Sequence, residues 1–152
     1  MGFLQQFFSN RIIGISALAW LIAQIIKIII DLIRSKTIDW RLITSSGGMP
    51  SSHSSFVTSL ATSVGITRGF DSLEFAITFV LCMVVMYDAA GVRRAAGKQA
   101  AVINDIADIM ENYGFKMDEN LKELLGHTPV EVAAGATLGI VLSVVMNLYI
   151  LH

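Results

Sequence analysis

The chain has 152 residues, of which 54% are hydrophobic and 15% are charged, and its formal net charge at pH 7 is −1. Soluble domains carry about 25% charged residues, so this composition excludes an ordinary soluble domain and predicts a single integral membrane domain, residues 1–152. The small net charge argues against a partnership with nucleic acid. The single cysteine, Cys82, has no partner for an internal disulfide.

The first apolar segment covers residues 12–33, and we expect it to be a retained membrane anchor. Its uncharged part, residues 12–26, is shorter than the roughly 20 residues that a spanning helix needs. Lys27 and Asp31 must therefore lie near the membrane edge or face the protein interior. Lys27 and Arg34 share a helix face about 10 Å apart along the axis. They could clamp a phosphate, or Lys27 could pair with Asp31 while Arg34 snorkels to the headgroups.

A polar loop leads into a short helix expected over residues 53–68, whose many Ser and Thr residues suit packing among other helices. Pro50 fixes the entry of the chain, and Ser51 or Ser52 can cap the helix. The free N–H groups of a helix start can hold phosphate oxygens, and His53 could then protonate a leaving oxygen. The alternative is an ordinary capped helix with a histidine at the membrane interface.

A third apolar segment covers residues 73–86, and Arg93 and Arg94 follow it shortly afterwards. Guanidinium groups donate in a planar fork that suits phosphate. The alternative is that both arginines simply anchor the end of a membrane span. Asp88, between the segment and the arginines, could orient an arginine or end the helix.

The next part of the chain, residues 93–125, carries most of the remaining charge. Its apolar residues recur at helical spacing and predict an amphipathic helix over residues 95–113, lying on the membrane or against a partner. These residues are Ala101, Ile103, Ile106, Ile109, Met110 and Tyr113. A second short helix is expected over residues 118–125.

The last apolar segment covers residues 130–151 and carries small residues that permit close helix contact, namely Ala133, Ala134, Gly135 and Gly139. Because four short spans make a thin shell for a buried polar site, we expect this face to seal a homodimer or a larger homo-oligomer.

His127 and Glu131 stand at the start of this last segment. Residues four apart share one helix face, so the carboxylate could bond one ring nitrogen and leave the other as a nucleophile. The alternative is a routine polar pair at a helix start.

These segments predict an all-α integral membrane bundle of about four membrane-embedded helices plus an amphipathic helix. Four spans place both termini on one side of the membrane. The opposite side carries most of the cations, and the positive-inside rule places that side in the cytoplasm of the cell. These cations are Arg34, Lys36, Arg41, Arg93, Arg94, Lys98, Lys116 and Lys122.

Three motifs resemble the phosphatidic acid phosphatase type 2 (PAP2) superfamily, which also includes vanadium-dependent haloperoxidases. They are Gly-Gly-Met-Pro-Ser-Ser-His at 47–53, Tyr-Asp-Ala-Ala-Gly-Val-Arg-Arg at 87–94 and Leu-Leu-Gly-His-Thr-Pro-Val-Glu-Val at 124–132. The combination looks like the small divergent branch of that superfamily and extends from Lys27 to Gly135. The resemblance implies a PAP2-like helical fold.

Several positions depart from the wider superfamily's motifs. Ser52 takes the place of the glycine in Pro-Ser-Gly-His, and Ser35 takes the place of the proline that follows Arg34. Glu131 replaces an aspartate, which preserves the charge and lengthens its reach.

The third superfamily motif also has an arginine six residues before its histidine, here His127, whereas this chain has Leu121. We infer that Arg93 or Arg94 supplies the missing guanidinium and that residues 95–121 form a polar insertion.

The resemblance implies a metal-independent phosphatase without a cofactor. In it, His127 attacks phosphorus to form a phosphohistidine, Glu131 orients His127, and His53 protonates the leaving oxygen and then activates water. The groups implied to bind phosphate are Lys27, Ser51, Ser52, Arg93 or Arg94, and Arg34 by its motif position. The substrates implied are phosphorylated membrane lipids or polyprenyl diphosphates.

Two other functions are compatible with the residues. The chain could be a non-catalytic membrane protein that binds a phosphorylated lipid or an anion, which the Glu131 replacement and the displaced arginine would favour. It could also be a scaffold subunit, whose amphipathic helix over residues 95–113 would then be the functional surface.

Overall fold

The computed structural model describes residues 2–36, 48–113, 121 and 126–151. Within these ranges every regular element is a helix. The helices are α1 (Phe3–Phe8), α2 (Arg11–Ser35), α3 (Ser52–Arg68), α4 (Leu73–Tyr87), the π-helix η2 (Asp88–Val92), α5 (Arg93–Asn112) and α6 (Pro129–Leu151). The short helix expected over residues 118–125 lies outside the described residues, as do Arg41, Lys116 and Lys122.

The predicted all-α membrane fold is confirmed. Helices α2 to α6 reproduce the five predicted segments to within one or two residues at each end. The sequence analysis missed α1 and the π-helix η2.

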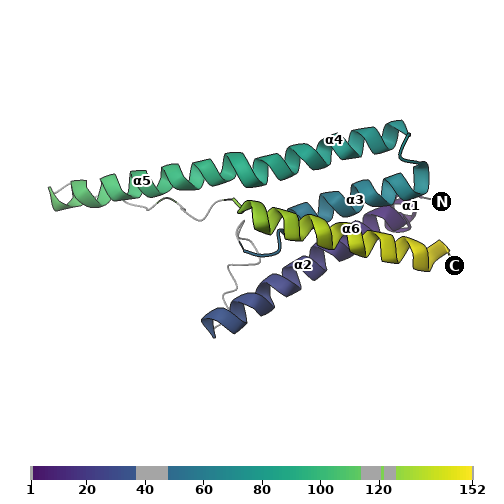
Figure 1. Ribbon diagram of the computed structural model, residues 1–152, viewed down its shortest axis with the longest axis horizontal. Coiled ribbons are helices and arrows are strands. Elements are labelled where there is room, and N and C mark those ends of the chain that lie inside the picture. Colours follow the sequence, from purple (N-terminus) through teal and green to yellow (C-terminus); the bar gives the residue numbers. More distant parts are fainter. Residues whose placement is uncertain (1, 37–47, 114–120, 122–125, 152) are drawn as a thin grey trace.

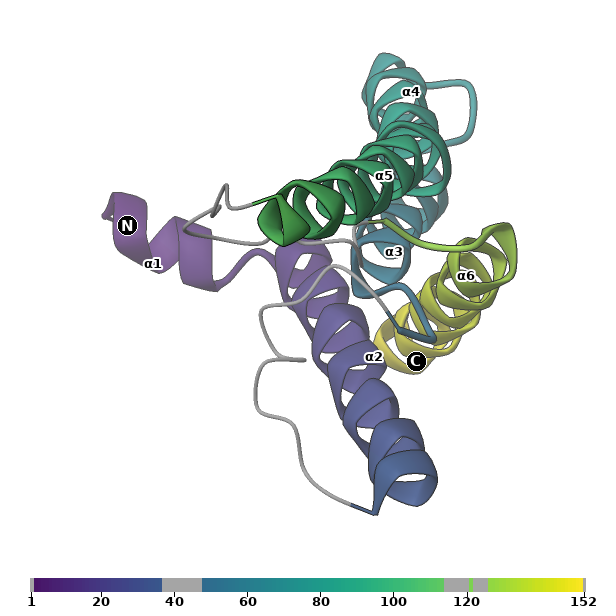
Figure 2. The same cartoon turned by 90° about the vertical axis from the view of Figure 1, so that its left-hand side faces the viewer.

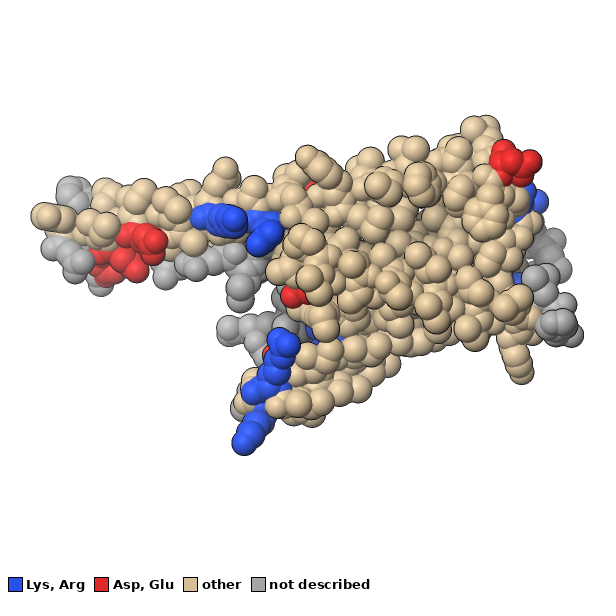
Figure 3. All heavy atoms as spheres, viewed as in Figure 1, with Lys and Arg blue, Asp and Glu red and all other residues tan. Residues whose placement is uncertain are grey.

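Helices α2, α3, α4 and α6 run in alternating directions, so that α1 and the end of α6 lie at the same end of the bundle (Figure 1). Seen from the other end, α3 lies among α2, α4 and α6 (Figure 2), and it contacts all three. We call this other end, where α2 ends and α3, α5 and α6 begin, the basic end. Lys and Arg side chains gather there over the end of α2 and the start of α5 (Figure 3).

Among the described residues, three helices are long and apolar enough to cross a membrane: α2, the continuous helix Leu73–Glu111, and Pro129–Tyr149 within α6. The fourth, α3, has 17 residues and is enclosed by the others. The molecule is therefore a membrane protein with a short central helix.

Helix α3 buries small hydroxyl side chains where a soluble core helix would bury large apolar ones. Ser55 Oγ donates to the Ala19 carbonyl of α2 at 3.1 Å, and Thr58 Oγ1 donates to the Ala136 carbonyl of α6 at 3.2 Å. Small residues allow helix backbones to approach closely in a membrane, and these hydrogen bonds satisfy hydroxyls that have no water to bond. Close packing around α3 therefore holds the starts of α3 and α6 together.

The small-residue face of α6 packs inside the same chain. A Cβ added at Gly135 would fall on the Ser51 carbonyl oxygen, and one added at Gly139 would fall on Thr58 and the Ser55 carbonyl oxygen. Atoms of α3 and of its N-cap thus fill the space beside both glycines. The prediction that they seal a contact between copies is wrong for these two positions, whereas the homo-oligomer itself stays a prediction.

Helices α4 and α5 form one continuous helix through η2, which projects beyond the bundle (Figure 1). The sequence analysis treated the third span and the amphipathic helix as separate segments, because the composition changes abruptly between them. The π-helix joins them without a break. Asn104 ties α5 to the returning chain, since its side chain exchanges two 2.9 Å hydrogen bonds with the Leu121 backbone.

Candidate active site

Four parts of the chain meet at the basic end. Lys27 comes from α2, His53 from the first turn of α3, Arg93 from the first turn of α5, and His127 and Glu131 from the start of α6. The charge of Lys27 acts on both histidines, and that of Arg93 acts on His53. Residues as far apart in sequence as Lys27 and Glu131 therefore form one electrostatically connected cluster.

His127 is the most enclosed member of the cluster, with its side chain 3% exposed. Its Nδ1 lies 3.3 Å from Oε2 of Glu131. Its Nε2 is buried and has no hydrogen-bond partner among the described residues. A proton on Nδ1 is donated to Glu131, so the lone pair is on Nε2. The ring is thus held from one side and presents a bare nitrogen on the other.

Glu131 also completes a helix cap that the sequence analysis missed. Its Oε2 accepts the Thr128 backbone N–H at 2.9 Å, and Thr128 Oγ1 accepts the Glu131 backbone N–H at 3.3 Å. This reciprocal pair is a capping box, for which Thr128 followed three residues later by Glu131 is the sequence signal. The cap fixes the carboxylate from a second direction and so restricts the orientation of His127.

The backbone before His127 docks on the start of α5. Gly126 has φ +87°, and a Cβ there would fall on the Arg94 backbone nitrogen. The His127 N–H donates to the carbonyl of Ala89 in η2 at 2.9 Å. π-Helices often occur at functional sites, and this one accepts the backbone hydrogen bond that positions His127.

Burial lowers the pKa of the His127 imidazole, which precedes the α6 span, below its ordinary value. The hydrogen bond and the charge of Glu131 oppose this shift, whereas the charges of Lys27 and His53 add to it. The net effect favours the neutral ring, which is the form that can act as a nucleophile.

The start of α3 supplies His53 and backbone donors. Ser51, the N-cap, accepts the Ser54 N–H through Oγ at 3.3 Å, and its own N–H donates to the Glu131 carbonyl at 3.0 Å. The Ser51 N–H is therefore paired within the protein and its Oγ accepts, so binding of phosphate by this N–H is not supported, while a role for the Ser51 hydroxyl stays a prediction. In the described part of the chain, the N–H groups of Ser52 and His53 have no partner and lie at the positive end of the helix dipole.

Lys27 lies inside the bundle, with 3% of its surface exposed. Its aliphatic stem passes under Gly48, which has φ +93°; a Cβ there would lie 3.2 Å from Lys27 Cγ. The loop residue thus covers the stem, and the ammonium charge acts on both histidines.

Arg93 Nε donates to Asp88 Oδ2 at 2.6 Å, across the π-helix. The charges of both residues act on His53. The side chain of Arg94 makes no ion pair among the described residues, and its backbone packs against Gly126. The geometry therefore distinguishes two arginines that the sequence did not separate. Of the two roles considered for Asp88, the ion pair is consistent with orienting an arginine, since the helix continues through Asp88.

Arg34 is not part of the cluster. It is exposed near the end of α2, two turns beyond Lys27, and its charge acts on neither histidine. The rise of an α-helix carries it about 10 Å further along the axis, away from the starts of α3 and α6. The predicted phosphate-binding role of Arg34 is therefore not supported by its position.

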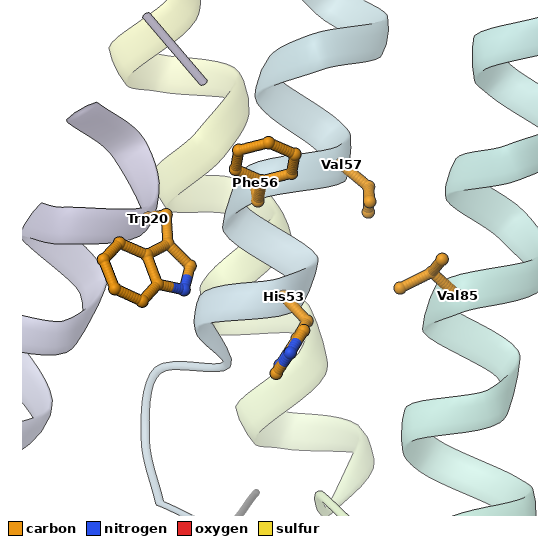
Figure 4. A pocket seen from close by; sticks show the side chains of 5 residues that line it. All are labelled: Trp20, His53, Phe56, Val57 and Val85. Carbon is orange, nitrogen blue, oxygen red and sulfur yellow. The ribbon is translucent and has the colours of Figure 1, made fainter. Parts of the chain in front are cut away.

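A pocket of about 340 Å³ opens beside His53 between α2, α3 and α4 (Figure 4). Its remaining lining residues are apolar or aromatic: Trp20, Phe56, Val57 and Val85. Trp20 faces it from α2 and Val85 from α4, while His53 lies at its polar edge. The sequence analysis did not predict this pocket, because its walls come from three separate helices.

The described residues contain no group of three or more His, Cys, Asp or Glu side chains placed to hold a metal ion. Beside the carboxylates of Glu131 and Asp88, the converging groups include two histidines, Lys27, Arg93 and two backbone N–H groups, which suit an anion.

Comparisons with known proteins show which family the chain belongs to. The chain is 44% identical over 144 residues to the uncharacterized membrane protein YuiD of Bacillus subtilis (strain 168), which covers 87% of this chain and 91% of the relative. No solved structure matches it. The sequence profile of the divergent PAP2 family matches residues 8–142. The chain therefore belongs to the divergent PAP2 family.

Proposed function

We propose that this protein is a membrane phosphatase that hydrolyses a lipid-linked phosphate or diphosphate through a phosphohistidine on His127. The observation that carries the proposal is the state of the His127 ring: Nδ1 is held by Glu131, and Nε2 is buried and without a hydrogen-bond partner among the described residues. A nucleophilic histidine needs this combination of a fixed ring and an uncommitted lone pair.

In the first step, the Nε2 lone pair of His127 attacks phosphorus and forms the P–N bond. The bond from phosphorus to the lipid oxygen breaks, and protonated His53 gives its proton to that oxygen, so the lipid leaves as an alcohol or, from a diphosphate, as a monophosphate. Nδ1 keeps its proton, and Glu131 stabilises the positive charge that develops on the ring.

In the second step, neutral His53 takes a proton from water as the oxygen attacks phosphorus. The P–N bond breaks, inorganic phosphate leaves, and His127 regains its lone pair. His53 ends protonated, ready for the next substrate, so protons balance over the cycle.

The groups around the histidines suit the charge that develops on phosphate oxygens. Lys27 and Arg93 supply positive charge at the edge of the membrane, and the Ser52 and His53 N–H groups supply oriented donors. Fixed donors in a site shielded from water stabilise a trigonal-bipyramidal phosphoryl group far more than they would in bulk water.

The pocket beside His53 supports a substrate with an apolar chain. It lies among helices that cross the membrane, and four of its five lining residues are apolar or aromatic. A phosphate held by Lys27 and Arg93 would leave its hydrocarbon chain against Trp20 and Phe56. We also propose that the basic end faces the cytoplasm, because Lys and Arg gather there (Figure 3).

The test is phosphate release by the purified protein in detergent from a panel of lipid phosphates and polyprenyl diphosphates, in the presence of EDTA. His127→Ala is assayed beside the wild type, with thermal melting to show that both are folded. Release by the wild type alone supports a metal-independent His127 phosphatase. If the folded wild type releases phosphate from no substrate, the phosphatase proposal fails and lipid-phosphate binding without turnover becomes the account to pursue.

A further inference from the structure

Helix α5 carries an apolar face that nothing in the described structure covers. Five residues of α5 and its C-cap, Tyr113, are between 42% and 80% exposed. The five are Val102, Ile103, Ile106, Ile109 and Met110. The opposite face is buried, through Ala100, Asn104 and Ala107, and is the face that Leu121 contacts. Leu121 therefore contacts the buried side of α5, and the more apolar side is the exposed one.

Contact with lipid tails does not explain why this apolar face of α5 is exposed. The continuous helix from α4 into α5 has 39 residues, which at about 1.5 Å per residue is nearly twice the ~30 Å of a bilayer's hydrocarbon core. The site residues of α3 and α6 mark where the bundle ends, and α5 projects beyond that level (Figure 1). Its apolar face consequently stands outside the hydrocarbon core.

The spacing of this face is that of a helix that pairs with another helix. Gln99, Ile103, Ile106, Met110 and Tyr113 follow one another at alternating intervals of four and three residues, which is the pattern of the inner positions of a coiled coil. The charged residues fall on the outward positions of the same repeat. They are Arg94, Lys98, Asp105, Asp108 and Glu111.

The same face continues onto α4. Its exposed positions there also recur at intervals of four and three, and the interval of five from Tyr87 to Val92 spans the π-helix. These positions are Leu73, Ile77, Val80, Val84, Tyr87 and Val92, each more than half exposed. The extra residue of the π-helix thus brings the lipid-facing side of α4 into line with the apolar face of α5.

The charges on the outer half of α5 indicate whether its apolar face binds a membrane surface or a protein. Helices that lie on membranes carry Lys and Arg on their polar face, whereas the outer half of α5 carries Asp105, Asp108 and Glu111 (Figure 3). Anionic headgroups would repel that half. A second copy would not, because its charges also point outward from the repeat.

We propose that two copies of this chain pair through this face, with their α5 helices parallel and in register. Copies in one membrane share an orientation, so a two-fold axis along the membrane normal brings the same face of each copy together. Equivalent residues of the inner positions then meet at the axis. The proposal is independent of whether the protein hydrolyses phosphate.

The test is disulfide cross-linking in native membranes of cysteines introduced one at a time. Ile103→Cys and Ile106→Cys place a thiol at the axis, and Asp108→Cys, on the same helix, places one on the outward side. Wild type is the blank, because its one cysteine, Cys82, is buried in the bundle. We expect mild oxidation to give a covalent dimer from both isoleucine variants and none from Asp108→Cys or the wild type.

Equal dimer from Asp108→Cys, or no dimer from either isoleucine variant while Asp108→Cys still reacts with a water-soluble maleimide, would overturn the proposal. If Ile106→Cys resists both the oxidant and the maleimide, lipid covers the face and the proposal is also wrong. As a second measurement, Ile106→Glu should halve the mass of the protein by light scattering in mild detergent, whereas Asp108→Lys should leave it unchanged.

Discussion

Nδ1 of His127 lies 3.3 Å from Oε2 of Glu131, and the same carboxylate oxygen accepts the Thr128 N–H at 2.9 Å. One carboxylate therefore both caps α6 and orients the ring that precedes it. The glutamate found here in place of the superfamily's aspartate keeps this contact, because its longer side chain reaches back across the first turn of the helix. Mutations at Glu131 should consequently change catalysis and helix capping together.

Replacing Glu131 by Gln keeps most of the cap and removes the charge. Since Glu131 raises the pKa of His127, its loss should lower that pKa further. Phosphorylation needs neutral Nε2, so the acid limb of the kcat/KM profile should move to lower pH. The rate at the optimum should fall roughly 10²-fold or more, the usual range for losing an orienting acid–base partner. A pH–rate profile of each protein checks this.

Glu131→Asp is the matched variant. It restores the charge, so the acid limb should return toward that of the wild type and activity should exceed that of Glu131→Gln. Equal activity of the two variants would show that a carboxylate without the reach of the glutamate side chain does not restore the reaction.

The two arginines at the start of α5 should differ in effect. Arg93 pairs with Asp88 and acts on His53, whereas Arg94 contributes its backbone to the Gly126 contact. Arg93→Ala should lower kcat/KM by about 1.5–3 kcal/mol, the worth of a hydrogen bond to a charged group, or about 10- to 150-fold. Arg94→Ala should stay within a few fold. Larger loss from Arg94→Ala would reverse the assignment.

Asp88 should act through Arg93 as a positioning residue. Asp88→Asn removes one charge of the pair but should leave the guanidinium in place, so we expect KM for a lipid phosphate to rise more than kcat falls. In an Arg93→Ala background the same change should have little further effect, which a double-mutant cycle measures.

Gly48 should be intolerant of a side chain although it lies outside every helix. A Cβ there would lie 3.2 Å from Lys27 Cγ, and the residue has φ +93°, so Gly48→Ala strains the loop and displaces the lysine stem. We expect a loss of activity of roughly tenfold with a fall in stability of about 1 kcal/mol. Gly14→Ala is the control, because nothing lies within 4 Å of the added Cβ.

The pocket beside His53 should control chain recognition rather than chemistry. Val85→Phe fills part of its 340 Å³ volume, so kcat/KM for long-chain lipid phosphates should fall by tenfold or more. Activity toward a water-soluble short-chain phosphate should change less than threefold. Val145→Phe adds the same bulk on the exposed side of α6 and should affect neither substrate. Equal losses on both substrates would argue against a chain-binding pocket.

Much of this fold could be predicted, because the spacing of apolar residues and the length of apolar segments indicate membrane helices directly. The spans, the amphipathic character of α5 and the histidine motifs were all readable from local pattern. The π-helix was not, because the composition changes at the point where the helix continues, and a change from apolar to charged residues looks like a helix end.

The site could be predicted only in part. A local sequence pattern does not show how far a side chain lies from the other site residues, nor which acceptor a backbone N–H will bond. His127, Glu131 and His53 follow from motifs. The pairing of the Ser51 N–H with the Glu131 carbonyl could not be predicted, since it depends on how α3 meets α6. Arg93 could be told from Arg94 only after the π-helix set the direction of each side chain.

The central claim, a covalent phosphohistidine at His127, is tested most directly by trapping it. Wild type and His53→Ala are quenched in alkali during turnover of a lipid phosphate, and the peptide containing residue 127 is examined by mass spectrometry. We expect phosphate on His127 in the wild type and none in His127→Ala. In His53→Ala both the departure of the lipid oxygen and the attack of water are slowed, so phosphate already formed on His127 should persist longer than in the wild type once the substrate is removed. Turnover by the wild type without any phosphate on His127, or continued turnover by His127→Ala, would contradict it.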